Sequence, residues 1–391
     1  SSNGLEKRPK LRFPGFDEPW SIYKAEELFK NVADKNHPME TVLTIIQGKG
    51  TLPREQAGRN IHYDDASLAN YKKVEQGDFI IHLRSFEGGL EMANEDGIVS
   101  PAYTILRCMK PHSSLFYEAY FHTDEFINHI LSKSVEGIRD GRQISYEAFK
   151  WLGLPYCDLS EQERIAQLFC TLSHRIEKQQ QMVDALKKYK RGLFNQIFSA
   201  ISKSSQCRKL RELVRVSGGK TPSMSNSLYW NGDIVWISSK DMKSSRISGS
   251  ELKITNLALN EMTLYHPGTL LLVARSGILK HSLPLAILEV DATINQDIKA
   301  LQVHGCNAFY LYYAILSQED TIIRTLVKTG TTVQSLMMDS FLNIEIPTPD
   351  IDQQQRIIDK LAKLEKYVEV QEKELSLLSQ MRNGLLQQLF I

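Results

Sequence analysis

The stretch Pro155-Tyr-Cys-Asp-Leu-Ser-Glu-Gln-Glu-Arg-Ile165 returns later in the chain as Pro347-Thr-Pro-Asp-Ile-Asp-Gln-Gln-Gln-Arg-Ile357. The two copies are 192 residues apart, and this offset holds without a gap to the last residue, Ile391. Such a repeat indicates an internal duplication. The identical pairs include Asp158/Asp350, Gln162/Gln354, Arg164/Arg356, Leu172/Leu364, Gln179/Gln371, Leu186/Leu378, Gly192/Gly384, Leu193/Leu385, Gln196/Gln388 and Phe198/Phe390.

Each copy has the pattern of a long helix. Ser160-x-x-Glu163 and Asp352-x-x-Gln355 have the spacing of a capping box, and prolines precede both. Apolar residues then recur with heptad spacing, which is typical of a coiled coil. One stripe alone fits a helix packed on its own domain, but two matched stripes favour pairing with each other. The predicted interface consists of Ile165, Phe169, Leu172, Ile176, Val183, Leu186 and Leu193 from the first copy, and Ile357, Leu361, Leu364, Val368, Leu375, Leu378 and Leu385 from the second.

The connection between the copies predicts their direction. The first helix is expected to end near Ser199, and a Ser/Lys linker over 202–206 leads into new globular sequence. The second helix must run back to lie along the first, so the pair is predicted to be antiparallel. With a rise of 1.5 Å per residue, about 37 residues give a rod of roughly 55 Å. We expect a globular domain at each end and a pseudo-two-fold arrangement.

The globular halves are more distant relatives of each other. Glu27-Leu28 matches Glu212-Leu213, Phe149 matches Phe341, and Arg84-Ser85 matches Arg275-Ser276. The segments 77–85 and 268–276 each predict a turn followed by a strand that ends on an arginine. We therefore expect an α/β (α+β) fold with two mixed domains separated by the paired helices, and the topology within each domain stays open.

Composition and motifs narrow the function. The chain has 47 Lys and Arg against 46 Asp and Glu, and 42% hydrophobic residues, as in an ordinary globular protein. The 5 cysteines are widely spaced and favour neither disulfides nor zinc, and no apolar run is long enough to cross a membrane. The chain shows no signal-peptide pattern, so the cytoplasm is expected. Gly218-Gly-Lys-Thr221 lacks the first glycine of a phosphate-binding loop, and other catalytic signatures are missing. The sequence predicts a chain without enzymatic activity of its own and without a metal site.

Two similar but unequal domains at a fixed separation suit a split DNA site, because half-sites one helical turn apart are about 34 Å apart. Arginine can bind guanine through two hydrogen bonds, whereas lysine more often contacts phosphate. Arg84 and Arg275 stand out because they recur at the same place in both halves. The candidate DNA-binding residues are Lys49, Arg54, Arg59, Arg84, Arg139 and Arg142 in the first half, and Lys220, Lys240, Lys243, Arg246, Arg275, Lys280 and Lys328 in the second.

Over nearly its whole length the chain resembles the specificity (S) subunit of type I restriction–modification systems. The set of strings in this order, together with the repeat, carries the resemblance. These strings are Leu11-Arg-Phe-Pro-Gly-Phe16, Arg84-Ser-Phe-Glu-Gly-Gly89, Gly97-Ile-Val-Ser-Pro-Ala-Tyr103, Gly137-Ile-Arg-Asp-Gly-Arg142, Leu159-Ser-Glu-Gln-Glu-Arg-Ile-Ala166, Gly218-Gly-Lys-Thr-Pro222, Gly232-Asp-Ile-Val-Trp-Ile-Ser238 and Ile294-Asn-Gln-Asp-Ile298. Tyr156-Cys157 departs from a more proline-rich approach to the helix.

The resemblance implies a non-catalytic subunit that recognises an asymmetric, bipartite site on double-stranded DNA. It implies target-recognition domains over 1–152 and 206–346, and helical spacer regions over 153–205 and 347–391. It also implies assembly with two modification subunits, which methylate adenine N6 with S-adenosylmethionine, and with restriction subunits that use ATP and Mg. The paired helices would dock the modification subunits, and no cofactor is expected on this chain.

Three alternatives stay open at the level of sequence. A self-contained DNA-modifying enzyme is disfavoured by the missing catalytic motifs. A coiled-coil scaffold that does not touch nucleic acid predicts no salt-dependent DNA binding and no effect of Arg84→Ala or Arg275→Ala. A homodimer could pair its helices between chains. The target sequence itself cannot be derived from these residues, because it depends on loop geometry and DNA shape.

Overall fold

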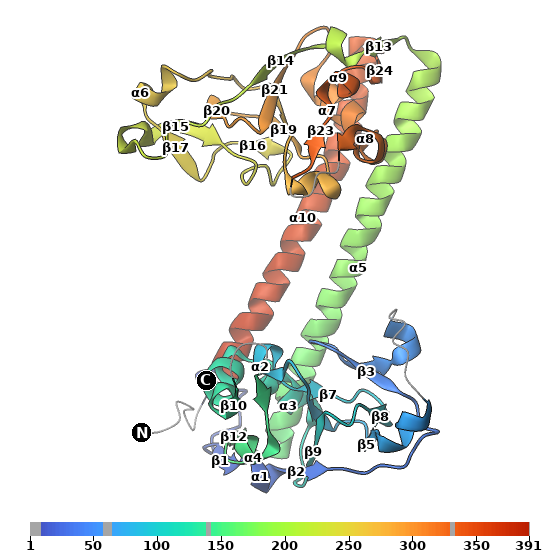
Figure 1. Cartoon of the computed structure of the whole chain (residues 1–391), viewed down its shortest axis with the longest axis vertical. Coiled ribbons are helices and arrows are strands. Elements are labelled where there is room, and N and C mark those ends of the chain that lie inside the picture. The colour runs from blue at the N-terminus through green and yellow to red at the C-terminus, as the bar shows by residue number, and fades with distance from the viewer. Residues whose placement is uncertain (1–8, 58–64, 138–141, 329–332, 391) are drawn as a thin grey trace. The chain divides into compact units, whose positions relative to one another are not determined.

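The fold is known from a computed structural model that describes residues 9–57, 65–137, 142–328 and 333–390. The chain divides into two compact units (Figure 1). Unit 1 comprises residues 1–180 and 373–391, and unit 2 comprises residues 181–372. Each unit therefore consists of a globular part and one segment from each of the two long helices. Each long helix contributes to both hydrophobic cores.

The two long helices are α5 (Leu159–Ser204) and α10 (Ile351–Phe390). In place of the predicted capping boxes, the aspartate two residues earlier caps each helix: Asp158 Oδ1 accepts from the Ser160 N–H at 2.9 Å, and Asp350 Oδ1 from the Gln353 N–H at 2.8 Å. Helix α5 also extends to Ser204, beyond the predicted end near Ser199. It continues because Ile201, only 6% exposed, packs in the core of unit 2.

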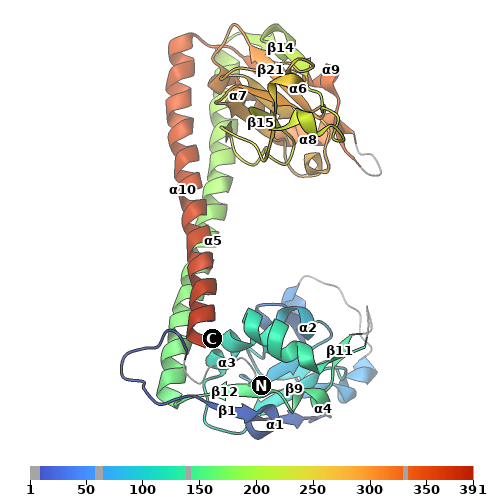
Figure 2. The same cartoon turned by 90° about the vertical axis from the view of Figure 1, so that its left-hand side faces the viewer.

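Within each unit the helix segments run antiparallel. Residues closer to the C-terminus of α5 contact residues closer to the N-terminus of α10, so the two helices have opposite directions (Figure 2). The pairs that show this are Phe169 with Phe390 (ring centroids 6.1 Å apart) and Arg175 with Glu374 (3.3 Å) in unit 1, and Lys187 with Glu372 (2.6 Å) and Lys190 with Glu365 (3.4 Å) in unit 2.

The main sheets of the two units have the same strand order. In unit 1 the order is β2 (Phe29–Val32), β9 (Thr104–Cys108), β6 (Phe79–Ile81), β7 (Glu91–Met92). In unit 2 it is β14 (Val214–Gly218), β21 (Ile298–Val303), β18 (Leu270–Val273), β19 (Leu285–Leu288), followed by β16 (Arg246–Ile247). The predicted mixed α/β fold in two related halves is confirmed, and the sheet topology, which the sequence left open, is duplicated as well.

The register of the strands also matches between the units. Phe79 pairs with Leu106 and Met92 in unit 1 as Leu270 pairs with Leu301 and Ile287 in unit 2. Before the central strands, Gly77 and Gly268 hold positive φ angles of 92° and 87°, which favour glycine in the turn. The segments around Arg84 and Arg275 therefore form the predicted turn and strand, although the strands β6 and β18 end shortly before each arginine.

Smaller sheets and short helices complete each unit. Among them, the hairpin β10–β11 of unit 1 corresponds to the hairpin β22–β23 of unit 2. The unit 1 elements are β1 (Ser21–Lys24), α1 (Ala25–Leu28), β3 (Leu43–Ile46), β4 (Gly50–Pro53), β5 (Lys72–Val74), α2 (Ser85–Gly88), β8 (Gly97–Val99), α3 (Ser114–Phe121), β10 (Val135–Glu136), β11 (Gln143–Ile144), α4 (Tyr146–Phe149) and β12 (Gly153–Tyr156). The unit 2 elements are β13 (Cys207–Lys209), β15 (Trp230–Ile237), β17 (Leu252–Ile254), α6 (Asn256–Leu259), β20 (Ala292–Ile294), α7 (Ala308–Leu316), α8 (Glu319–Leu326), β22 (Val327–Lys328), β23 (Ser335–Leu336), α9 (Met338–Phe341) and β24 (Glu345–Pro347).

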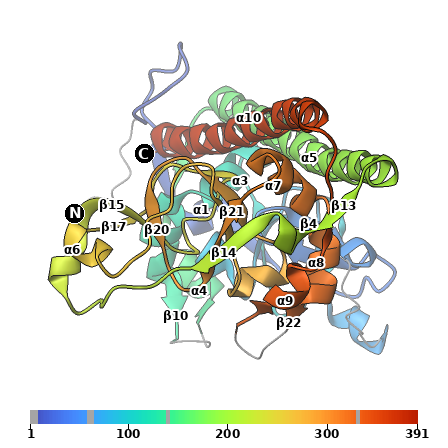
Figure 3. The ribbon, with the colours of Figure 1, turned by 90° about the horizontal axis from the view of Figure 1, so that it is seen from above.

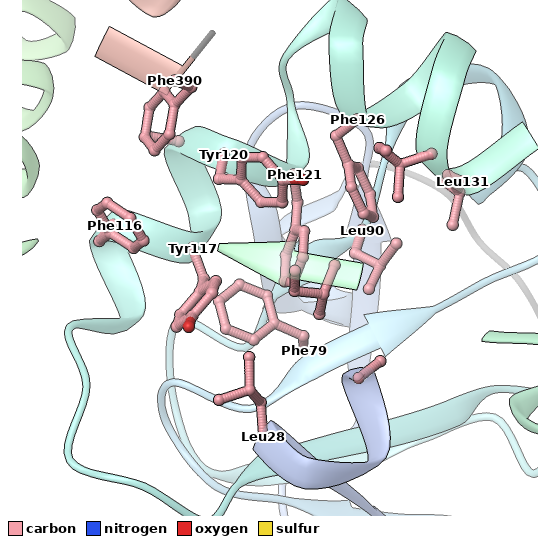
Figure 4. Close-up of a cluster of buried hydrophobic side chains, with 14 of the residues drawn as sticks. Leu28, Phe79, Leu90, Phe116, Tyr117, Tyr120, Phe121, Phe126, Leu131 and Phe390 are labelled. Atoms are coloured by element: carbon pink, nitrogen blue, oxygen red, sulfur yellow. The ribbon is translucent and has the colours of Figure 1, made fainter. Parts of the chain in front are cut away.

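The core of each unit lies between its sheet and its share of the long helices. In unit 1 the aromatic face of α3 packs on Phe79 from the sheet and on Phe390 from α10 (Figure 4). In unit 2 the corresponding helix is α7, which lies beside α10 (Figure 3). This apolar packing fixes the sheet of each unit to its helices, and Arg84 and Arg275, which follow the central strands, are exposed.

Candidate nucleic-acid interface

The central strands of unit 2 end together at one edge of the sheet. Strand β21 runs antiparallel to both β14 and β18, and its first residues pair with the last residues of those strands, Gly218 with Lys299 and Val273 with Ile298. The chain leaves β14 toward Lys220 and leaves β18 toward Arg275. Both side chains are exposed. This arrangement places two of the predicted cations at the same edge of unit 2.

Arg275 and Lys328 lie on opposite sides of one residue, Ser335. Ser335 pairs with Lys328 in the β22–β23 hairpin and forms an isolated antiparallel bridge with Arg275. Residues directly opposite each other in an antiparallel ladder project to the same face. Backbone hydrogen bonds from Ser276 to Gln334 (3.1 Å) and from Leu336 to Ala274 (2.8 Å) hold this pairing. Arg275, Ser335 and Lys328 therefore form a short row on one face, which we call the unit 2 row.

The backbone on either side of Lys220 is fixed by close contacts. Its N–H donates to the Ile294 carbonyl (3.0 Å), and its carbonyl accepts from the Trp236 indole N–H (3.1 Å). A Cβ atom on the preceding Gly219 would lie 2.0 Å from the Ile294 oxygen, so only glycine fits there. The main chain is therefore anchored at this point, while the exposed ammonium group of Lys220 is free to reach a ligand.

The equivalent edge of unit 1 carries a different set of side chains. Arg84 is exposed after β6, next to His82, whose ring centroid is 6.4 Å from that of Tyr103. Burial lowers the pKa of His82, so its neutral form is favoured. Burial raises the pKa of Tyr103, and the positive charge of Arg54 opposes that rise. The Lys72 ammonium donates to the Tyr103 carbonyl. This edge therefore combines cations with an aromatic pair.

The hairpins differ in charge at one equivalent position. Glu136 pairs with Gln143 in β10–β11 at the position where Lys328 pairs with Ser335 in β22–β23. Nearby, the Arg142 guanidinium lies 4.3 Å from the centre of the Phe86 ring and 4.0 Å from a carboxylate oxygen of Glu87. The two units therefore present unlike surfaces on matching scaffolds. Arg59 and Arg139 lie outside the described residues.

Some predicted cations are not brought to these edges. The Lys49 carbonyl accepts from Asn94 (2.8 Å) near the start of β6, at the end of that strand opposite Arg84. Arg246 pairs with Glu289 (3.0 Å) and covers the Phe309 ring at 4.7 Å. It lies next to Ile287, which pairs with Leu270 at the start of β18. The remaining predicted lysines, all exposed, are Lys240 and Lys243 after β15 and Lys280 shortly after Arg275.

The predicted helix interface can also be located. Every predicted residue in it is buried or half-buried in the unit to which it belongs. The buried polar residue Gln179 lies among them, at 8% exposure. Sequence reasoning missed Phe194 and Phe198, which are more buried than their neighbours Leu193 and Ile197 because they pack on Tyr313 and Tyr310 of α7. Only the position of α7 reveals this.

Sequence reasoning also missed the residues that connect the cations. Ser335 carries no charge and belongs to no motif, so only the bridge to Arg275 identifies it. Lys72 and Tyr103 meet through a side-chain hydrogen bond to the backbone, although Tyr103 did close one of the strings of the resemblance. Within the described residues, no cluster of His, Cys, Asp and Glu has the geometry to hold a metal ion. No helix in these ranges is long and apolar enough to span a membrane.

Fold and surface define a duplicated α/β protein with paired helices and cationic strand edges. Residues 202–380 match the family described as the type I restriction modification DNA specificity domain. The chain is 32% identical over 252 residues to the type I restriction enzyme EcoR124I/EcoR124II specificity subunit of Escherichia coli, which covers 61% of this chain and 62% of that protein. It is 30% identical over 197 residues to the MjaIX specificity subunit of Methanocaldococcus jannaschii, covering 49% of this chain and 45% of that protein.

A solved structure extends the similarity to the whole fold. The crystal structure of the S subunit of a type I restriction–modification system from M. genitalium aligns with a TM-score of 0.59 at 15% identity, and covers 98% of this chain and 99% of that one. The chain is thus similar to type I restriction–modification specificity subunits, as the sequence resemblance predicted, and residues 202–380 match their DNA specificity domain. It spans less than two thirds of the length of the curated relatives that it matches.

Proposed function

We propose that the chain is the DNA-recognition subunit of a type I restriction–modification complex and that each unit binds one half of an asymmetric, bipartite site. The observation that supports this most directly is the placement of Arg84 and Arg275 after equivalent central strands of two matching sheets. Exposed cations at strand ends suit phosphate and base-edge contacts. Because Glu136 replaces Lys328 in the equivalent hairpin, the two half-sites are expected to differ.

In this proposal residues 1–152 and 206–346 are the target-recognition domains, and 153–205 and 347–391 are the helical spacer regions. The helices set the spacer between half-sites and dock two modification subunits and the restriction subunits. The chain itself is not catalytic. Adenine-N6 methylation with S-adenosylmethionine, and DNA translocation and cleavage with ATP and Mg, belong to the partner subunits. The expected compartment is the cytoplasm.

The test of recognition is the salt dependence of DNA binding by the chain assembled with its modification subunit. Each lost phosphate contact lowers the slope of log affinity against log salt by about 0.9. We expect Arg275→Ala and Lys328→Ala each to weaken binding and lower the slope, unless Arg275 contacts a base, in which case its loss relaxes specificity at one position. Arg246→Ala is the matched control, because Arg246 is paired with Glu289 at the other end of β18.

The bipartite site is tested by mapping methylated adenines in cells that carry the chain and its modification partner. The expected result is one split motif with unlike halves, and exchange of 206–346 for the same region of a relative should change one half only. An assembled complex that binds DNA without salt dependence and adds no methylation would contradict the proposal and favour a scaffold.

A further inference from the structure

Two tyrosines show which residues of the units occupy equivalent places. The Tyr117 hydroxyl of α3 donates to the Pro155 carbonyl (3.0 Å), and the Tyr310 hydroxyl of α7 donates to the Pro347 carbonyl (2.7 Å). Since the two helices share this anchor, the positions that follow it correspond. Two residues further along, unit 1 has Ala119 where unit 2 has Tyr312, a replacement that removes a phenol ring.

Two buried glutamines give the same correspondence for the long helices. Gln162 accepts from the Ser113 N–H (3.0 Å) and donates to the Cys157 carbonyl (2.9 Å). Gln354 accepts from the Asn307 N–H (2.9 Å) and donates to the Pro349 carbonyl (2.8 Å). With the helices in this register, Ser173 of unit 1 corresponds to Glu365 of unit 2, and Arg382 of unit 1 corresponds to Lys190 of unit 2.

In unit 2 these positions are filled by a complete polar cluster. The Glu365 carboxylate, 12% exposed, accepts from the hydroxyls of Tyr312 (3.2 Å) and Tyr313 (3.1 Å) and pairs with the Lys190 ammonium (3.4 Å). Burial raises the pKa of both tyrosines, so they remain hydroxyl donors at neutral pH. The cluster thus consists of one carboxylate, one cation and two phenols, and all of them come from unit 2.

In unit 1 the corresponding place is a pocket. It has a volume of about 450 Å³, which is within the range of small-molecule sites. Ala119 and Ser173 line it where unit 2 has Tyr312 and Glu365, and Arg382 lines it as the counterpart of Lys190. Among the described residues, the buried Arg382 Nε has no hydrogen-bond partner, and neither has the hydroxyl of Tyr120, the counterpart of Tyr313 (Figure 4 shows Tyr120 beside Phe390). Unit 1 therefore retains the cation but has Ser173 at the place of the carboxylate that pairs with the cation in unit 2.

The wall of the unit 1 pocket is also more polar than the equivalent part of unit 2. Glu118 and His122 on α3 line the pocket, whereas the corresponding residues of α7, Leu311 and Ile315, are fully buried aliphatic side chains. Both side chains are half-buried, and the His122 ring is already paired with Glu91 at 3.3 Å. The pocket is thus a polar site in unit 1 at a place where unit 2 has only packing and an internal ion pair.

The charges in the pocket decide the sign of the ligand. Arg382 is permanently cationic, because a guanidinium does not lose its proton in proteins. Glu118 and Glu177 also line the pocket and favour a cation. Burial raises the pKa of Glu118, although the positive charges of His122 and Arg382 oppose that rise, and Glu177 is exposed and screened by water. The cluster in unit 2 provides the comparison, because there the equivalent cation binds a carboxylate beside a phenol ring.

We propose that the unit 1 pocket binds a carboxylate next to an aromatic ring, which takes the place of the Glu365 and Tyr312 side chains of unit 2. The carboxylate pairs with Arg382, and the ring lies against Ala119 and Phe169. The ligand is either a free aromatic acid or an acidic side chain next to an aromatic one on a partner polypeptide. The pocket makes the two units unequal for any partner that binds along the long helices.

The test uses the full chain and calorimetric titration with 3-(4-hydroxyphenyl)propionate. The corresponding amide lacks the negative charge, and tyramine carries a positive charge in its place. The wild type is expected to bind the acid at least tenfold more tightly than either. Arg382→Gln should weaken binding of the acid at least tenfold. Arg175→Gln is the matched control and should bind like the wild type, since Arg175 lies outside the pocket and is exposed beside Glu374.

A second variant fills the pocket from within. Ala119→Tyr combined with Ser173→Glu copies the unit 2 cluster, so the chain should stay folded, unfold at a higher temperature and lose binding of the acid. Tighter binding of tyramine than of the acid would overturn the proposal. Undiminished binding of the acid to the filled variant would overturn it as well, and so would the absence of any binding to the wild type.

A competition experiment distinguishes the two sources of the ligand. If the free acid competes with the modification subunit for the chain, and the filled variant binds that subunit more weakly, the carboxylate belongs to the partner. If binding of the partner is unchanged, the ligand is a free acid. This step alone rests on the proposed function. A chain that binds the acid but no modification subunit would refute that part of the proposed function and leave the pocket assigned.

Discussion

Arg12 and Glu161 form an ion pair with two hydrogen bonds, Nε to Oε1 at 2.8 Å and Nη2 to Oε2 at 2.7 Å. The Trp20 indole N–H donates to the same carboxylate at 3.0 Å. The Glu161 side chain is 1% exposed and belongs to the first turn of α5, whereas Arg12 belongs to the N-terminal segment. This pair fixes the N-terminal segment to the helix of unit 1.

Replacement of one partner should destabilise unit 1. Glu161→Gln leaves the Arg12 guanidinium partly buried without its counter-charge, and a broken buried pair costs about 3 kcal/mol. We expect a lower temperature of unfolding, measured by calorimetry on the full chain. Glu374→Gln is the control, because its partner Arg175 is 63% exposed and such surface pairs contribute about 0–1 kcal/mol. Equal effects of the two variants would contradict this role of the N-terminal segment.

Glu136→Lys should make unit 1 resemble unit 2 at the hairpin. The lysine would occupy the place of Lys328, opposite Gln143, and add a cation beside the strand edge that carries Arg84. We expect tighter DNA binding with a salt slope steeper by about 0.9. Glu147→Lys, which changes the charge of unit 1 equally in helix α4, serves as the control. The same gain in both variants would indicate a general charge effect.

Gly219→Ala should displace the backbone that carries Lys220. The new Cβ would lie 2.0 Å from the Ile294 oxygen, and overpacking of this kind costs about 1–3 kcal/mol. We expect lower stability of unit 2 together with weaker DNA binding. Gly249→Ala is the matched control, since nothing lies within 4 Å of its Cβ position. If Gly219→Ala unfolds like the control, the close approach at Lys220 does not constrain the loop.

The pair Glu91–His122 should make the stability of unit 1 depend on pH. His122 Nε2 lies 3.3 Å from Glu91 Oε1, and Glu91 also accepts from the N–H groups of Gly48 and Gly50. Burial alone raises the pKa of Glu91, but the hydrogen bonds from His122 and the two glycines outweigh burial and lower it. Burial alone lowers the pKa of His122, but the contacts with Glu91 and Glu118 raise it.

These directions fix the sign of the effect. Stabilisation by His122 is complete below its ordinary pKa of 6.5 and is lost as the pH rises through its higher folded pKa. Stabilisation by Glu91 is complete above its ordinary pKa of 4.5 and is lost as the pH falls through its lower folded pKa. Unfolding temperatures should therefore fall as the pH rises above 6.5, and His122→Gln should flatten this fall. His174→Gln, an exposed histidine of α5, should not.

The strand edges show how far the sequence could predict the candidate site. The match of Arg84 with Arg275 marked both positions, because a single arginine next to an equivalent serine is visible in an alignment of the two halves. The row Arg275–Ser335–Lys328 could not be predicted from the sequence, because Ser335 joins the two cations through a bridge between residues far apart in the chain. The separation of Arg246 from this row likewise depends on the strand order of the sheet.

The end of helix α5 and the unit 1 pocket likewise depend on tertiary packing. The heptad pattern located α5, but its last turns continue because Ile201 is buried in the core of unit 2, which a local pattern does not contain. The replacement of Tyr312 and Glu365 by Ala119 and Ser173 is present in the sequence as two ordinary substitutions. It becomes a pocket only where α3 packs against the long helices.

The sequence by itself determined the duplication, the two long helices, the mixed fold of both halves and the resemblance to specificity subunits. These features follow from local periodicity and from the repeat at an offset of 192 residues, and both can be recognised without knowing which distant residues are in contact. Tertiary structure decided the strand order, the surface on which each cation lies and the unequal polar clusters around Arg382 and Lys190. Sheet pairing and packing join residues that are distant in the chain, and their register depends on the whole core.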